Sequence, residues 1–180
     1  MSSTILATLR DEFADLSDPE QFTRVAVRLV VAVVLGAAIG YEREKSSSTA
    51  GLRTHMLVAL GVALVIVAAE QSGFDNADVS RVLQGVLAGI GFLGAGAILK
   101  QADKAEIKGL TTAASIWSTA AIAIAAGLGK EATAILATAV VVVILSLLLR
   151  LERRMQPASQ GNHASDDSDK GGSESNATVK

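Results

Sequence analysis

The chain has 180 residues, of which 50% are hydrophobic and 19% are charged, so it is too apolar for an ordinary soluble domain of this length. Its formal net charge of −2 argues against a nucleic-acid partner, because such proteins concentrate Lys and Arg to replace the counterions of phosphates. The absence of cysteine excludes disulfides and thiol chemistry.

The first 24 residues form a polar N-terminal segment. Apolar residues recur in it at helical spacing between charged ones, which predicts an amphipathic surface helix, with a partly ordered polar tail as the equal alternative. These apolar residues are Ile5, Leu9, Phe13 and Leu16. Asp18 and Pro19 then supply a capping residue and a first-turn proline, so a new helix is predicted to begin near Asp18. No removable signal peptide is expected.

Five apolar segments follow, and each is long enough to be considered as a membrane span of about 20 residues. They cover residues 25–41, 56–69, 82–99, 110–128 and 132–149. The second is the shortest, so it either extends over Leu52–His55 or spans with local thinning of the bilayer. We therefore predict an all-α fold, a polytopic transmembrane helix bundle over residues 25–154. Residues 155–180 are predicted to be a disordered hydrophilic tail.

The distribution of Lys and Arg predicts the orientation, because basic loops stay in the cytoplasm. Basic residues gather in the first and third connections and directly after the last span, whereas the other two connections hold one each. This alternation predicts an outside N-terminus and a cytoplasmic C-terminus. Arg24 and Arg28 do not fit this arrangement, because it places these two basic residues at the outside end of the first span.

Glycines at four-residue spacing mark the first and third spans. Such residues allow helix backbones to approach closely in lipid, which predicts close helix packing within one subunit. The more specific alternative is that the glycines permit a broken or mobile helix that lines a functional site. The residues concerned are Gly36, Gly40, Gly85, Gly89, Gly91, Gly94 and Gly96. The stretch from Gly89 to Gly94 matches a dinucleotide-binding pattern, but it lies inside an apolar span with no preceding strand, so that interpretation is rejected.

Charged and polar residues gather where the first span ends and the second begins. They are either anchors at the membrane boundary or paired groups around a site. The candidates are Glu42, Arg43, Arg53, Thr54 and His55. Pairing of Glu42 with Arg53 and of Arg43 with Glu70 are both open. His55 lacks further ligands at a recognisable spacing, so no metal site is predicted.

A second polar group opens the fourth span. Thr111 and Thr112 follow the flexible Gly109, and their hydroxyls favour bonding between helices, or alternatively a small polar pocket that faces Arg43 and Arg53. Trp117 is predicted to pack against the glycine-rich third span. No nucleophile with a base and an acid is apparent, so we expect neither enzymatic activity nor a cofactor.

Several of these strings together resemble the MgtC/SapB family of small bacterial inner-membrane proteins. The matching strings are Gly40–Glu44, Ala50–His55 with Leu57–Gly61, Gly89–Gly96, and Gly109–Ala114 with Trp117. They cover residues 25 to 150 in the family's order. The resemblance implies a bacterial inner-membrane protein linked to magnesium-limited growth, and it favours Arg43 and Arg53 as site residues. The polar tail from Pro157 departs from members that carry a folded C-terminal domain.

Two kinds of function follow from this sequence. The first is a non-enzymatic regulator that contacts membrane lipid and another membrane protein, with assembly into a homo-oligomer also open. The second is a small transporter or channel for magnesium, built from helices bent at glycine. The scarcity of acids inside the spans favours the first.

Overall fold

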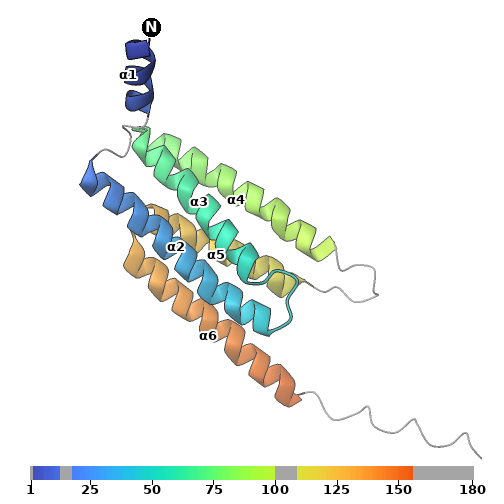
Figure 1. The fold of residues 1–180 in the computed structure, drawn as a ribbon. Helices are drawn as coiled ribbons and strands as arrows, with labels where there is room; N and C mark the ends of the chain where they lie inside the picture. Colours follow the sequence, from blue (N-terminus) through green and yellow to red (C-terminus); the bar gives the residue numbers. More distant parts are fainter. Residues whose placement is uncertain (1, 13–17, 100–108, 156–180) are drawn as a thin grey trace, which may run out of the picture.

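The computed structural model describes residues 2–12, 18–99 and 109–155, and this part of the chain is entirely helical. Six helices follow one another (Figure 1). They are α1 (Ser2–Glu12), α2 (Pro19–Lys45), α3 (Leu52–Gln71), α4 (Asn76–Leu99), α5 (Leu110–Gly127) and α6 (Glu131–Met155). The predicted all-α fold is thereby confirmed. The predicted tail lies outside the described residues, apart from its first residue, Met155.

Helices α2 to α6 correspond to the five predicted spans and form one bundle (Figure 1). Among the described residues, four of them, α2 to α5, are long and apolar enough to cross a membrane, and α6 contains a further apolar stretch that includes Glu131–Leu147. Helix α3 begins at Leu52 and has 20 residues, which gives it a length of about 30 Å. The second span therefore uses its polar entrance, and its helix matches the thickness of a bilayer core.

The N-terminal part of the chain follows the predicted boundaries. Helix α1 stands apart from the bundle in Figure 1 and exposes Ile5, Leu6 and Leu9. Phe13 and Leu16, the other predicted members of its apolar face, lie outside the described residues. Asp18 caps α2, because its Oδ1 accepts a hydrogen bond from the Glu20 amide at 3.1 Å, and Pro19 is the first helical residue.

Helix α5 occupies the centre of the bundle and contacts α2, α3, α4 and α6. Its buried face consists of small and aliphatic residues, among them Ala120, Ala123 and Ala126, which are fully buried. Side chains of this size let four neighbouring helices approach one axis. Helix α4 lies at the edge of the bundle, against α5 and, less extensively, α3 (Figure 1).

Three glycines allow close contact within the bundle. A Cβ atom on Gly36 would lie 2.7 Å from the Ala59 Cβ, and one on Gly40 would lie 2.8 Å from the Leu52 Cα, so α2 and α3 meet through these positions. Gly127 likewise lets α5 approach α3, because a Cβ atom added to Gly127 would lie 2.9 Å from the Ile66 Cβ. The predicted packing role is thus observed for Gly36 and Gly40.

The glycines of α4 are placed differently. An added Cβ on Gly94 would make an ordinary contact with Ala113 at 3.6 Å. At Gly85, Gly89, Gly91 and Gly96 it would meet no described atom of another segment within 4 Å. The prediction that these four glycines pack helices together within the subunit is therefore wrong. They lie on the faces of α4 that point away from α5, whereas Gly94 lies on the face that touches it.

An ion pair joins three helices at the opposite end of the bundle from the α2–α3 loop. Nη1 of Arg28 contacts a carboxylate oxygen of Glu70 and also donates to the Gly127 carbonyl oxygen at 3.0 Å. Among the described residues, neither of the two pairings left open by the sequence occurs, and Glu70 is paired with Arg28 instead of Arg43. Arg28 closes the C-terminus of α5, where a cation complements the helix dipole.

Candidate functional site

A buried polar cluster lies at the end of the bundle where α2 ends and α3 and α5 begin, which we call the loop end. Most of the buried polar side chains of the described chain belong to it. Arg43 comes from the last turn of α2, His55 from the first turn of α3, and Thr112 and Ser115 from the first two turns of α5. Ser48, in the α2–α3 loop, completes the cluster.

Hydrogen bonds link the loop to both helices. The Ser48 amide donates to the Arg43 carbonyl oxygen at 3.1 Å, and the Ser48 hydroxyl lies 2.9 Å from that of Thr112. The Ser46 amide and hydroxyl bond back to the last turn of α2. Ser47 adopts a positive φ of 55°, which turns the chain sharply after the helix. The three serines of the α2–α3 loop, residues 46–48, thus form a defined turn over the start of α5 and not a simple linker.

His55 is fully buried, and both of its ring nitrogens have partners. Nδ1 lies 2.8 Å from the Gly51 carbonyl oxygen, so it carries a proton and donates. Nε2 lies 3.1 Å from the Ser115 hydroxyl oxygen, and this hydroxyl is also 2.8 Å from the Thr112 carbonyl oxygen. Ser115 has one proton to donate. It therefore bonds either to Nε2 of a neutral His55 or, beside a doubly protonated His55, to the carbonyl oxygen.

Arg43 is buried, with 7% of its surface exposed, and lies on the same face of α2 as Gly36, Ile39 and Gly40. Its Nε has no hydrogen-bond partner, and no described acid forms an ion pair with it. It is close enough to His55 for its charge to act on that ring. The half-buried Glu42 lies close enough for its charge to act on Arg43, so the cost of removing the guanidinium from water is offset only in part.

The other residues predicted for this site lie outside the cluster. Arg53 and Thr111 are exposed, and Glu42 is half-buried. The sequence therefore places Arg43 correctly at the loop end, but Arg53 does not share its buried environment. Trp117 is 49% exposed. It lies one turn after Ala113, the residue of α5 nearest to Gly94, and its packing against α4 stays a prediction.

Two residues of the loop end, Ser48 and Glu44, are not among the predicted site residues. The sequence does not indicate a site role for Ser48 or Glu44, yet Glu44 Oε2 accepts a hydrogen bond from the Leu52 amide at 2.8 Å. Glu44 thereby caps α3 from the preceding helix. A signal was available, because Gly51, directly before α3, has no side chain to cap it.

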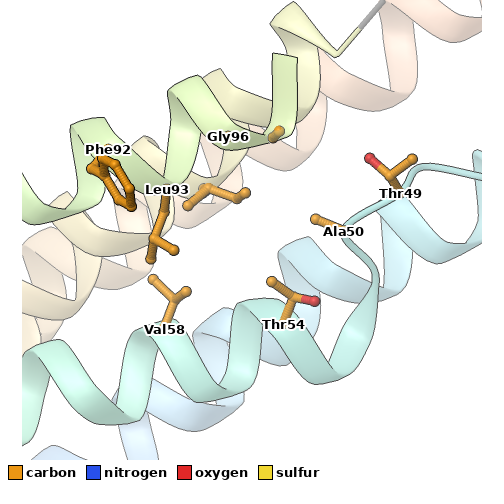
Figure 2. A pocket seen from close by; sticks show the side chains of 9 residues that line it. Thr49, Ala50, Thr54, Val58, Phe92, Leu93 and Gly96 are labelled. Carbon is orange, nitrogen blue, oxygen red and sulfur yellow. The ribbon is translucent and has the colours of Figure 1, made fainter. Parts of the chain in front are cut away.

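An apolar groove runs between α3 and α4, beside the polar cluster. Its outer part, of about 590 Å³, is lined by Thr49 and Ala50 of the loop, Thr54 and Val58 of α3, Phe92, Leu93, Gly96 and Ala97 of α4, and Ile116 of α5. Figure 2 shows Val58 and Leu93 pointing toward one another across it. These two residues also line a deeper part of about 380 Å³ that includes Gly61 and Gly89. The groove therefore follows the two helices into the apolar part of the bundle.

The fold and this site define a multi-pass α-helical membrane protein, with a polar cluster at one end of the bundle and an open apolar groove along one side. Comparison with known families gives a more specific assignment. Residues 29–154 match the MgtC family, and the chain belongs to this family.

Individual relatives agree with this assignment. The chain is 40% identical over 140 residues to Protein SrpB of Synechococcus elongatus, an alignment that covers 72% of this chain and 77% of the relative. It is 39% identical over 124 residues to Protein MgtC of Salmonella typhimurium, which covers 69% of this chain and 52% of the relative. The chain thus spans about half the length of that MgtC. No solved structure matches the chain significantly.

Proposed function

We propose that this protein is a non-enzymatic regulator in the bacterial inner membrane that supports adaptation to magnesium limitation by binding a helix of another membrane protein. The magnesium link comes from the resemblance to the MgtC/SapB family. The proposed orientation places the loop end, with its basic residues, in the cytoplasm and the N-terminus outside.

The groove between α3 and α4 is the observation that carries the proposal. Gly61 and Gly89 lie on its two sides, and an added Cβ at either position would meet no described atom of another segment within 4 Å. Gly85, Gly89, Phe92 and Gly96 recur at three- and four-residue spacing, so they share one face of α4. A partner helix can approach such a face closely, because association in lipid depends on van der Waals packing at small residues.

The aliphatic lining of the deeper groove determines the chemistry of the partner. Its residues are Leu57, Val58, Val62, Val65, Val86, Ile90 and Leu93, with the two glycines. No charged side chain lines it, so the partner segment is an apolar transmembrane helix and not an ion or a charged peptide. Phe92, 81% exposed, lies on the same face of α4 and is available to pack on that helix.

Replacement of Gly89 by Leu tests the proposal, because the added side chain fills the groove. We expect Gly89→Leu to lose a partner that crosslinks to and copurifies with the wild-type protein under magnesium limitation, and to lose growth at low magnesium. Ala139→Leu is the control, since Ala139 is exposed on α6 and also receives a leucine side chain, away from the groove.

Two results would contradict the proposal. The first is Gly89→Leu that retains both the copurifying partner and growth at low magnesium. The second is magnesium flux through the purified wild-type protein in liposomes, which would identify a transporter that acts alone. Both measurements use the full chain, with its amount in the membrane checked by immunoblotting.

A further inference from the structure

We propose that helix α1 is a lipid anchor. It lies in the surface of the bilayer at the end of the bundle where α2 begins, with Ile5, Leu6 and Leu9 inserted between the lipids. The proposed function does not involve this helix, and the anchor does not depend on the groove between α3 and α4 or on its partner.

The first argument is that α1 has no neighbour within the described chain. It makes no contact with any of the helices α2 to α6, and it stands apart from them in Figure 1. Helix α1 has 11 residues, whereas helices shorter than about 12 to 15 residues are only marginally stable in water on their own. A surface that covers its apolar side is therefore needed to hold this helix.

The second argument is the distribution of side chains around α1. Leu9 lies between Ile5 and Leu6 around the helix axis, so the three form one apolar side, whereas Thr4 and Thr8 share another side. The apolar side chains are 61% (Ile5), 67% (Leu6) and 50% (Leu9) exposed. Water does not stabilise such a patch, whereas the headgroup and acyl-chain boundary of a bilayer accepts the apolar side of an amphipathic helix.

The third argument is the short connection from α1 to a membrane span. The chain from Glu12 to Asp18 can bridge at most about 20 Å. Helix α2 has 27 residues, so it is about 40 Å long and exceeds the apolar core of a bilayer, which is about 30 Å thick. Its first turns carry the exposed pair of Glu20 and Arg24. The start of α2 therefore lies at the bilayer surface, and α1 is held within reach of that surface.

The charges of α1 indicate which force holds it there. Arg10 is the basic residue of this helix, while Asp11 and Glu12 are acidic, so the acids exceed the bases by one. Anionic lipids attract helices whose polar face is rich in Lys and Arg, and α1 has no such face. The contact is therefore apolar, and it forms with zwitterionic lipid as readily as with anionic lipid.

Spin labels on single cysteines measure the depth of α1. The chain contains no cysteine, so a label attaches only at an introduced position. Leu9→Cys carries the label on the apolar side, and Thr8→Cys carries it on the polar side. Both positions are exposed in a helix that does not touch the bundle, so neither change disturbs the bundle.

The labelled full chain is reconstituted at one molecule per nanodisc in phosphatidylcholine. Collisions of the label with oxygen, which concentrates in lipid, and with a water-soluble nickel chelate give its depth. We expect the label of Leu9→Cys to lie about 5 to 10 Å within the headgroup and acyl-chain boundary. The label of Thr8→Cys should be accessible to the nickel chelate. Addition of phosphatidylglycerol should leave both results unchanged.

A second substitution in the Leu9→Cys protein tests whether the apolar side is responsible. Ile5→Glu should lower the ratio of inserted to free helix by about tenfold, because the burial of an isoleucine side chain is lost. Thr4→Glu is the matched control, since it adds a carboxylate of the same kind at the neighbouring position on the polar side. It should leave the depth of the label as it is with Thr4.

Four results would overturn the proposal. Equal access of the nickel chelate to both labels would show that α1 lies in water. Low access of both reagents to the label of Leu9→Cys would show a contact with the bundle, since each nanodisc holds one chain. Insertion only in the presence of phosphatidylglycerol would show a contact governed by charge. Equal effects of Ile5→Glu and Thr4→Glu would show that the apolar side does not hold the helix.

Discussion

Helices α4 and α5 both consist mainly of small and aliphatic residues, yet half of the α5 span is buried and only 11% of the α4 span is. Helix α5 lies against four other helices, whereas α4 lies at the edge of the bundle. The glycines of α4 are spread around the helix, and four of them face no neighbouring segment, while α5 gathers its alanines and hydroxyls on buried faces. A high content of small residues therefore permits close packing but does not place a helix at the centre.

The contribution of a small residue to stability depends on whether it faces a neighbouring helix. The largest effect is therefore expected for a substitution that disrupts such a contact. Gly36→Leu should lower the free energy of unfolding by about 3 kcal/mol, because an added Cβ already lies 2.7 Å from that of Ala59. Gly85→Leu should change it by less than about 0.5 kcal/mol, since that position is open. Titration with a denaturing detergent measures both, and equal effects would show that the contrast between buried and open glycines has no energetic meaning.

A smaller effect is expected for the ion pair that holds the far end of α5. Arg28→Gln removes the bond to Glu70 and the bond to the Gly127 carbonyl oxygen, so it should lower the free energy of unfolding by about 2 kcal/mol. Arg24→Gln breaks a pair with Glu20 in which both side chains are exposed, and less than about 0.5 kcal/mol is expected there. A loss at Arg24 as large as that at Arg28 would show that the bonds of Arg28 to Glu70 and Gly127 stabilise the bundle no more than an exposed ion pair does.

The smallest effect concerns the hydroxyls of α5. Ser115→Ala removes a buried partner of His55 and should lower the free energy of unfolding by about 1 kcal/mol. Ser118→Ala is the matched control, because among the described residues the Ser118 hydroxyl bonds only to the Ala114 carbonyl oxygen of its own helix. Its removal should leave stability unchanged within error in the same titration. If the two variants behave alike, the bond between His55 and Ser115 does not hold α3 to α5.

Sequence alone determines the helices and the class of the protein. Long apolar segments must satisfy their backbone groups internally in lipid, which requires helices, and the capping of α2 by Asp18 and Pro19 can be derived from residue types alone. The motifs of the MgtC/SapB family likewise lie in the linear order of the chain, and the match over residues 29–154 confirms them.

Tertiary structure decides which side of each helix meets a neighbour. Gly36 and Gly85 have the same chemistry and similar local sequence, but only Gly36 faces another helix. Arg43 and Arg53 flank the same loop, but only Arg43 is buried, and Glu70 pairs with Arg28 and not with Arg43. The hydrophobic pattern does not resolve these choices, because lipid and the protein interior are equally apolar. Residues that face lipid and residues that face a neighbouring helix are therefore of the same hydrophobic types.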